Sequence, residues 1–458
     1  MSLYCSMLGS NIPHISKLGK TIDYFTFTHL EPKASPCFLS LHHNKSLSSH
    51  VGFVSKFEQN YSSPLTKEDK QMVDLVSPSE EYSKELDVAV RAVHMACSLC
   101  KKVRHGLISK PSSNDQVQSK DCSSSVAVTG WSVKAIVSCI LSAYLGGENI
   151  SILAEDDDVH TLSDTNATEL LEPVVKIVNE CLSEAPQFGF EAVKLKSPLG
   201  TSEVREIISR CTSIGDPSGR FWTLGFISRD QYAVGLSLIE DGEVVVGVLG
   251  SPDYPMRKDW FSYQKSYHRI ISKLIPLTSE TWNEGCVVYA KKGSGKAWIQ
   301  PLIHHVNKKF VWPNHAKEVS VSSIDNLGLA TLCQSVDKAD SISNHSFIDG
   351  LAHSVGLSNK PLRVYSMVKY VAIACGDAEA FMQFARSGHK EKIWDHAAGV
   401  VIIQEAGGTV TDIRGRSLDF SKGSYVEGID RGIVACTGSV LHKNIIDAVD
   451  ASWSSSSL

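Results

Sequence analysis

The amino-acid sequence predicts a layered α/β fold, and three patterns lead to that prediction. Between residues 80 and 210, apolar residues recur mainly at helical spacing. The stretch 221–249 is rich in strand-forming residues and contains Asp241-Gly242, a strong signal for a two-residue hairpin. From residue 286 onward, short strands alternate with helices. Elements that alternate in this way bury their apolar faces against one another in layers.

The elements of the first half follow from local spacing. Apolar residues recur every three or four positions from Leu86 to Cys97 and predict a first helix over 80–104. The serine-rich stretch 108–125 predicts a loop, and the apolar stretch 131–141 predicts a buried helix. After these we expect a strand over 151–154, an amphipathic helix around 170–181 with Pro173 near its start, and a helix around 202–210.

The second half is expected to contain, in order, strand 286–290, strand 297–300, helix 345–355, strand 367–374, helix 395–406, strand 409–412 and helix 438–449. Between the first two strands, residues 293–296 read Gly-Ser-Gly-Lys and resemble the end of a phosphate-binding loop. Ala290 and Ala297 stand where such a loop has a glycine and a hydroxyl, so we expect a hairpin turn instead.

Composition narrows the class of protein. Hydrophobic residues make up 42% of the chain and charged residues 21%, as in ordinary globular proteins. The net charge is -5 and no basic block stands out, so we expect no nucleic-acid partner. We find no apolar run of bilayer length and expect no membrane partner. The twelve cysteines lack paired spacing, and Cys97 and Cys100 fit buried helix residues better than a zinc or redox pair.

The chain is long enough for several domains. Residues 1–75 are set aside as a leader: its first sixty residues are serine-rich and contain lysine but no arginine. This leader reads either as a transit peptide for the mitochondrion or chloroplast, or as a disordered tail. We expect an N-terminal α+β domain over 76–275, a C-terminal α/β domain over 276–450 and a disordered tail over 451–458.

Two groups of carboxylates are candidates for chemistry. Asp395 opens an apolar helix that Gly407-Gly408 closes, and spacing alone favours a plain N-cap there. Residues 155–158, Glu-Asp-Asp-Asp, follow a short strand, and alone they read as a solvated loop.

The surrounding motifs change both interpretations. WDHAAG at 394–399 with EAGG at 405–408, and DQYAVGLSLIEDGEVVVGVLG at 230–250, resemble the 3'(2'),5'-bisphosphate nucleotidases of the inositol-monophosphatase-like superfamily. The resemblance spans about residues 82–449, and SMVKYVAIACGDAEAF at 366–381 is similar to the plant organellar members.

The resemblance implies an αβαβα sandwich fold. It also implies a Mg²⁺-dependent enzyme that removes the 3'-phosphate from 3'-phosphoadenosine 5'-phosphate and gives AMP and phosphate. It implies that Glu155 and Asp395 are metal ligands, and that Ser366 and Lys369 lie near the phosphate of this adenosine bisphosphate substrate. Several carboxylates that hold two or more magnesium ions would clamp the attacking and leaving oxygens.

The sequence departs from the family pattern at three places. In residues 124–131, SSVAVTGW, Gly130 stands where the resemblance implies an aspartate that activates water, and Ser125 and Ala127 replace a proline and a threonine. A D-P-x-D-G-T turn that would carry two metal-binding aspartates is missing between Leu224 and Gly225. Near the adenine site, Gln334 and Asp340 also differ from the pattern.

With only Glu155 and Asp395 left, we expect weak catalysis or none. We also expect an immediate turn at Gly225, with local distortion. Three alternatives stay open: a working nucleotidase with unusual ligands, an inactive pseudophosphatase that binds a nucleotide or a partner, and the product of an exon-skipped transcript or gene model.

Overall fold

The computed structural model describes most of the chain after residue 80. It leaves out residues 1–80, 109–117, 147–149, 156–166, 192–197, 212–218, 229–231, 255–284, 303–315, 336–341, 360, 365–366, 385–389, 427–431 and 457–458. The predicted leader, the acidic residues 156–158, Asp340 and Ser366 therefore lie outside the described residues.

The first sheet has seven strands whose spatial order follows the chain. They are β1 (Ile152–Ala154), β2 (Arg220–Ser228), β3 (Tyr232–Glu240), β4 (Glu243–Ser251), β5 (Cys286–Lys291), β6 (Ala297–Pro301) and β7 (Lys317–Val319). The β1–β2 pair is parallel and the others are antiparallel. Asp241 and Gly242 both have positive φ, of 50° and 80°, which confirms the predicted hairpin turn. The domain boundary predicted between residues 275 and 276 stays a prediction. The strands β5 to β7 come after that boundary in the chain and belong to the same sheet as β1 to β4.

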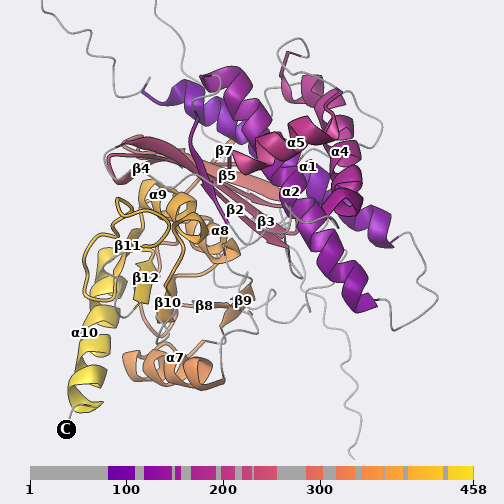
Figure 1. Ribbon diagram of the computed structural model, residues 1–458. Helices are drawn as coiled ribbons and strands as arrows, with labels where there is room; N and C mark the ends of the chain where they lie inside the picture. The colour runs from indigo at the N-terminus through magenta and orange to yellow at the C-terminus, as the bar shows by residue number, and fades with distance from the viewer. Residues whose placement is uncertain are drawn as a thin grey trace, which may run out of the picture. The chain divides into compact units, whose positions relative to one another are not determined.

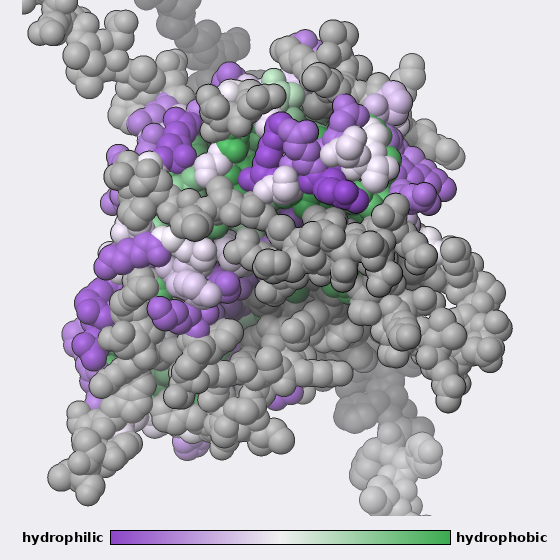
Figure 2. Space-filling view, viewed as in Figure 1, coloured by the Kyte–Doolittle hydropathy of each residue, from purple (hydrophilic) through white to green (hydrophobic). Residues whose placement is uncertain are grey.

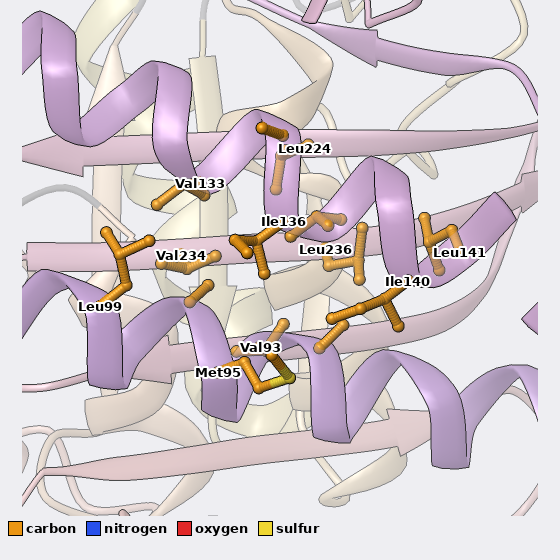
Figure 3. Close-up of a cluster of buried hydrophobic side chains, with 14 of the residues drawn as sticks. Val93, Met95, Leu99, Val133, Ile136, Ile140, Leu141, Leu224, Val234 and Leu236 are labelled. Carbon is orange, nitrogen blue, oxygen red and sulfur yellow. The ribbon is translucent and has the colours of Figure 1, made fainter. Parts of the chain in front are cut away.

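Helices cover one face of this sheet in two tiers (Figure 1). They are α1 (Ser83–Ile108), α2 (Gln118–Leu145), α4 (Ala167–Ser183) and α5 (Thr201–Ser209), with the short 3₁₀ helix η2 (Ala185–Phe188) after α4. The helices α1 and α2 contact the strands, while α4 and α5 pack on α2. Figure 3 shows Leu99 of α1, Ile136 of α2, and Leu224 and Leu236 of the sheet as members of one buried cluster.

The helix α2 corrects two sequence predictions. It begins at Gln118, so the loop predicted over 108–125 is wrong for its second part. Its segment Val126–Leu145 is long and apolar enough to cross a membrane, contrary to our reading of the sequence, but 72% of the 18-residue window that meets this criterion is buried in the protein. A helix that is apolar on most faces suits the centre of a fold. In Figure 2 the coloured surface is mostly hydrophilic or neutral, with small hydrophobic areas.

The second sheet has the order β11-β12-β10-β8-β9. Its strands are β8 (Leu332–Ser335), β9 (Leu362–Val364), β10 (Ala380–Phe384), β11 (Thr409–Asp412) and β12 (Gly432–Cys436). The helices α8 (Val368–Ala374) and α9 (Ala397–Glu405) pack between the two sheets, and α7 (Ile342–Val355) and α10 (Ser439–Ser456) cover the outer face. Along β12, Ile433 and Ala435 join the inner core, while Val434 and Cys436 join the outer one. The five layers confirm the predicted αβαβα sandwich.

Two further predictions were wrong in detail. Residues 368–374 form the helix α8, whereas we predicted a strand over 367–374. All seven residues of α8 are buried, and an apolar run with no exposed face carries no periodicity that separates helix from strand. The tail predicted from residue 451 continues α10 as far as Ser456, and the hydroxyl of Ser452 donates to the carbonyl of Ala448 at 2.8 Å.

Glycines on β4 let helices approach the first sheet from both faces. A Cβ at Gly247 would lie 2.6 Å from the carbonyl oxygen of Ala398 in α9. A Cβ at Gly250, three residues later and on the opposite face, would collide with Cys97 of α1. This close approach places the segment before α9, which contains Asp395, against the sheet.

Candidate functional site

The predicted site lies where the parallel strands β1 and β2 run side by side. Ala154 pairs with Leu224, so Glu155 comes at the carboxyl end of β1, next to the Leu224–Gly225 junction. Glu155 is exposed. The carboxyl ends of parallel strands are where α/β proteins usually place ligand-binding groups. The structure thus brings Glu155 to the junction at which the turn is missing.

The strand β2 runs through that junction without a break. Its pairing with β3 continues from Leu224 opposite Leu236 and Gly225 opposite Gly235 to Ser228 opposite Tyr232. The immediate turn and local distortion that we expected at Gly225 are therefore wrong. The physical reason is that four further residue pairs extend the antiparallel ladder, and its hydrogen bonds, which join alternate pairs, satisfy backbone groups that a turn would leave open.

Side chains keep alternating across the junction. A Cβ at Gly130 of α2 would lie 3.5 Å from Cδ1 of Phe226, whose ring thus faces that helix. A Cβ at Gly225 would lie 2.6 Å from the carbonyl oxygen of Trp394. Gly130 and the residue before Asp395 therefore lie over opposite faces of β2. The extended strand stands between two positions that the family resemblance would place in one metal centre.

Lys134 is a charged residue at this site that the sequence reasoning missed. It lies one helical turn after Gly130, and its ammonium group donates to the backbone carbonyl of Glu155 at 2.6 Å. Only 6% of Lys134 is exposed. The sequence could have pointed to Lys134, because it is the single charged residue in the apolar segment Val126–Leu145.

Asp395 closes the short 3₁₀ helix η6 (Ile393–Asp395), and α9 begins only at Ala397 with His396 as N-cap residue. The plain N-cap interpretation of Asp395 is therefore wrong. Asp395 is half-buried. The helix η6 packs against β2 and β3, where the facing glycines Gly225 and Gly235 leave room for its backbone.

A buried hydrogen-bond chain holds the residues around Asp395. The hydroxyl of Tyr370 lies 2.7 Å from Nδ1 of His396, and Nε2 of His396 lies 3.1 Å from Oε2 of Glu391. Burial alone would raise the pKa of Glu391, but the hydrogen bond with His396 and the electrostatic interactions with His396 and Lys369 lower it to about 2. Glu391 is thus an ionised acceptor, and Nε2 of His396 carries the donated proton.

Two of the residues predicted on the substrate side, Lys369 and Gln334, are buried and hydrogen-bonded within the protein. Lys369 lies on α8, rather than on a strand as predicted, and is 5% exposed. Its ammonium group donates to Oε1 of Gln383 at 2.7 Å and lies over the rings of Tyr370 and Phe381. Gln334 is also buried, and its amide donates to Asp349 at 2.6 Å.

The predicted hairpin turn at residues 293–296 is confirmed, and it holds a carboxylate from the same chain. Gly293 and Gly295 have positive φ, and their amides donate to the two oxygens of Glu405 at 2.7 and 2.5 Å. The hydroxyl of Ser294 donates to Glu405 at 3.0 Å. Successive amides that converge in this way form an anion site, and the last residue of α9 occupies it.

The described residues do not fit a centre of two or more magnesium ions. Among them, no three His, Cys, Asp or Glu side chains lie close enough to share a metal ion. Gly130 offers no side-chain oxygen, and the unbroken β2 supplies no turn with aspartates. An ammonium group, from Lys134, lies beside Glu155. We therefore derive no chemical step through magnesium.

Comparisons with known proteins agree with the resemblance found in the sequence. The model of the inositol monophosphatase family matches residues 148–454. The 3',5'-bisphosphate nucleotidase AHL of Arabidopsis thaliana is 52% identical over 381 residues, covering 82% of this chain and 98% of that protein. A 3'(2'),5'-bisphosphate nucleotidase of Oryza sativa is 31% identical over 375 residues, covering 80% and 94%. Among solved structures, an inositol monophosphatase from Anabaena aligns with 80% of this chain and 95% of its own at 16% identity, with a TM-score of 0.44. From the family model and the two plant relatives, the chain belongs to the inositol monophosphatase family, in its group of bisphosphate nucleotidases.

Proposed function

We propose that this chain binds an adenosine bisphosphate such as 3'-phosphoadenosine 5'-phosphate and hydrolyses it weakly or not at all. The names of its plant relatives support the nucleotide class. Lys369 and Ser366 stay predicted contacts to the phosphate. We further propose that the leader directs the chain to the mitochondrion or the chloroplast.

One observation supports the loss of turnover above all others: β2 continues through Leu224 and Gly225 as a regular strand. Metal-assisted hydrolysis of a phosphate ester needs ions that clamp both oxygens of the displacement, and a base for the attacking water. A regular strand of this sequence, Leu224-Gly225-Phe226, offers no carboxylate to an ion at this position. Gly130 cannot act as the base, and losing a general base alone lowers a rate by about 10²–10⁴-fold.

The test compares binding with turnover on the full-length chain. Calorimetry with 3'-phosphoadenosine 5'-phosphate measures binding, and phosphate release with and without Mg²⁺ measures turnover, beside the Arabidopsis relative. We expect binding, with release at least about 100-fold below that of the relative. Release at a rate near that of the relative, needing Mg²⁺ and lost in Glu155→Gln, would overturn the proposal. So would the absence of any binding.

The exon-skipping alternative is tested on the transcript. Matching sequence on both sides of the junction motivates it, at 221–224 and 225–250. Sequencing cDNA across the codons for Leu224 and Gly225 decides whether a longer form with the turn is made. The longer form would still carry Gly130, so we expect it to remain impaired.

A further inference from the structure

Lys134 lies in the part of the molecule where the family resemblance implies a metal ion. It shares a helix face with Gly130, because the two residues are one turn apart on α2. Gly130 faces Phe226, just past the junction in β2, and Lys134 reaches the end of β1. The two positions together cover the end of β1 and the part of β2 just past the junction from the α2 side.

The position of this ammonium group is built into the core. Trp131 and Val137, three residues before and after Lys134 on the same side of α2, are fully buried, and Lys134 itself is 6% exposed. The hydrocarbon stem of Lys134 is therefore buried, and its ammonium group reaches the backbone carbonyl of Glu155. A lysine ammonium is a compact, strongly hydrated point charge, so burying it against a carbonyl needs a specific partner. The carbonyl oxygen of Glu155 is one such partner.

We infer that Lys134 is the resident cation of this site and that it keeps divalent ions away from Glu155. A metal ion held by the Glu155 carboxylate would lie near the ammonium group that is already bound to the same residue. A unit charge and a double charge on the order of 6 Å apart repel by enough, even in a water-like dielectric, to weaken ion binding about tenfold. The inference has a second consequence, which rests on the proposed function: nucleotide binding needs no magnesium.

The first experiment requires no nucleotide. Mn²⁺ is titrated into the full-length apoprotein, and free Mn²⁺ is followed by electron paramagnetic resonance. We expect Glu155→Gln to leave the Mn²⁺ binding of the wild-type chain unchanged. Lys134→Gln is expected to create a site that binds Mn²⁺ about tenfold more tightly, and adding Glu155→Gln should remove that gain. Lys176→Gln, at an exposed position on α4, makes the same change in net charge and should have no effect.

Two results would overturn the inference. One is a Mn²⁺ site in the wild-type chain that Glu155→Gln abolishes. This result can be obtained without any Lys134 variant, so it does not depend on whether such a variant folds. The other is a folded Lys134→Gln chain, checked by circular dichroism, whose Mn²⁺ affinity is unchanged. Lys134→Arg keeps the charge and should behave as the wild type does.

The second experiment measures binding of 3'-phosphoadenosine 5'-phosphate by calorimetry, with excess Mg²⁺ or with EDTA. We expect the two dissociation constants to agree within about twofold, since no metal has to bridge the phosphate and Glu155. Binding that requires Mg²⁺ would overturn the inference. If no nucleotide binds under either condition, the proposed function fails, and the Mn²⁺ titration alone decides the role of Lys134.

Discussion

Replacing Gly225 by alanine tests whether β2 runs straight through the junction and supports the helix η6. The added Cβ would lie 2.6 Å from the carbonyl oxygen of Trp394 and 3.4 Å from Cε of Met367. The first contact is about 0.8 Å short of ordinary van der Waals distance, and the oxygen belongs to a backbone that cannot rotate away. Overpacking of this kind destabilises by about 1–3 kcal/mol, while replacing a strand glycine by alanine returns about 0.5–1 kcal/mol through backbone entropy.

We therefore expect Gly225→Ala to lower the free energy of unfolding by about 1–2 kcal/mol. Urea unfolding followed by tryptophan fluorescence measures it, and the dependence on urea concentration should not change. Gly350→Ala on α7 is the control: no atom lies within 4 Å of its added Cβ, so helix propensity should make that variant neutral or slightly more stable. If Gly225→Ala is as stable as the control, the segment does not pack under Trp394 and the register of β2 described above is refuted.

Two further predictions concern Gly130 and Glu391. Gly130→Ala should raise the free energy of unfolding by about 0.5–1 kcal/mol, because its Cβ makes only ordinary contact with Phe226 and alanine favours a helix. Gly130→Asp should destabilise by about 2 kcal/mol by placing a carboxylate against the ring, and it should not restore phosphate release. Urea unfolding measures the stability of both Gly130 variants, and a phosphate-release assay measures their turnover. Restored phosphate release in Gly130→Asp would contradict the prediction. For Glu391, the folded-state pKa of about 2 lies below the ordinary 4.5, so its contribution is present above about pH 5 and is lost as the pH falls towards 2. We expect Glu391→Gln to be less stable than the wild type by about 2 kcal/mol at neutral pH, with a smaller difference at pH 3; a difference that does not shrink would contradict the assignment.

The order of most elements could be predicted because their local patterns agree with the fold. The turn at Asp241-Gly242 and the helical spacing in α1 depend on neighbours in the chain, and both predictions are confirmed. The helix α8 could not be predicted in the same way. Its residues are buried on every side, so whether the segment is helix or strand depends on α9 and the second sheet, which the spacing does not reveal.

The candidate site was predicted only in part, for a different physical reason. Glu155 and the junction do lie side by side, because the parallel register pairs Ala154, the last residue of β1, with Leu224. The family resemblance implies a turn between residues 224 and 225, but whether the flanks loop or join depends on β3 and on the backbone of Trp394. The chain from Tyr370 through His396 to Glu391 links separate segments, and no local spacing identifies it.

The fold tolerates the missing turn because its stability is spread over many contacts, while the chemistry of a metal site depends on a few side chains. Joining Leu224 to Gly225 keeps the alternation of β2: Leu224 stays in the core beneath α2, and the glycine falls on the face where η6 needs space. The same join places no carboxylate at the position where the family resemblance implies a metal-binding turn, and no distant packing can supply one. On the inference drawn for Lys134, its charge adds to this effect by weakening the binding of a divalent ion at Glu155 about tenfold. Selection for a stable sandwich and selection for turnover therefore act on different atoms of one strand, and a chain can retain the first without the second.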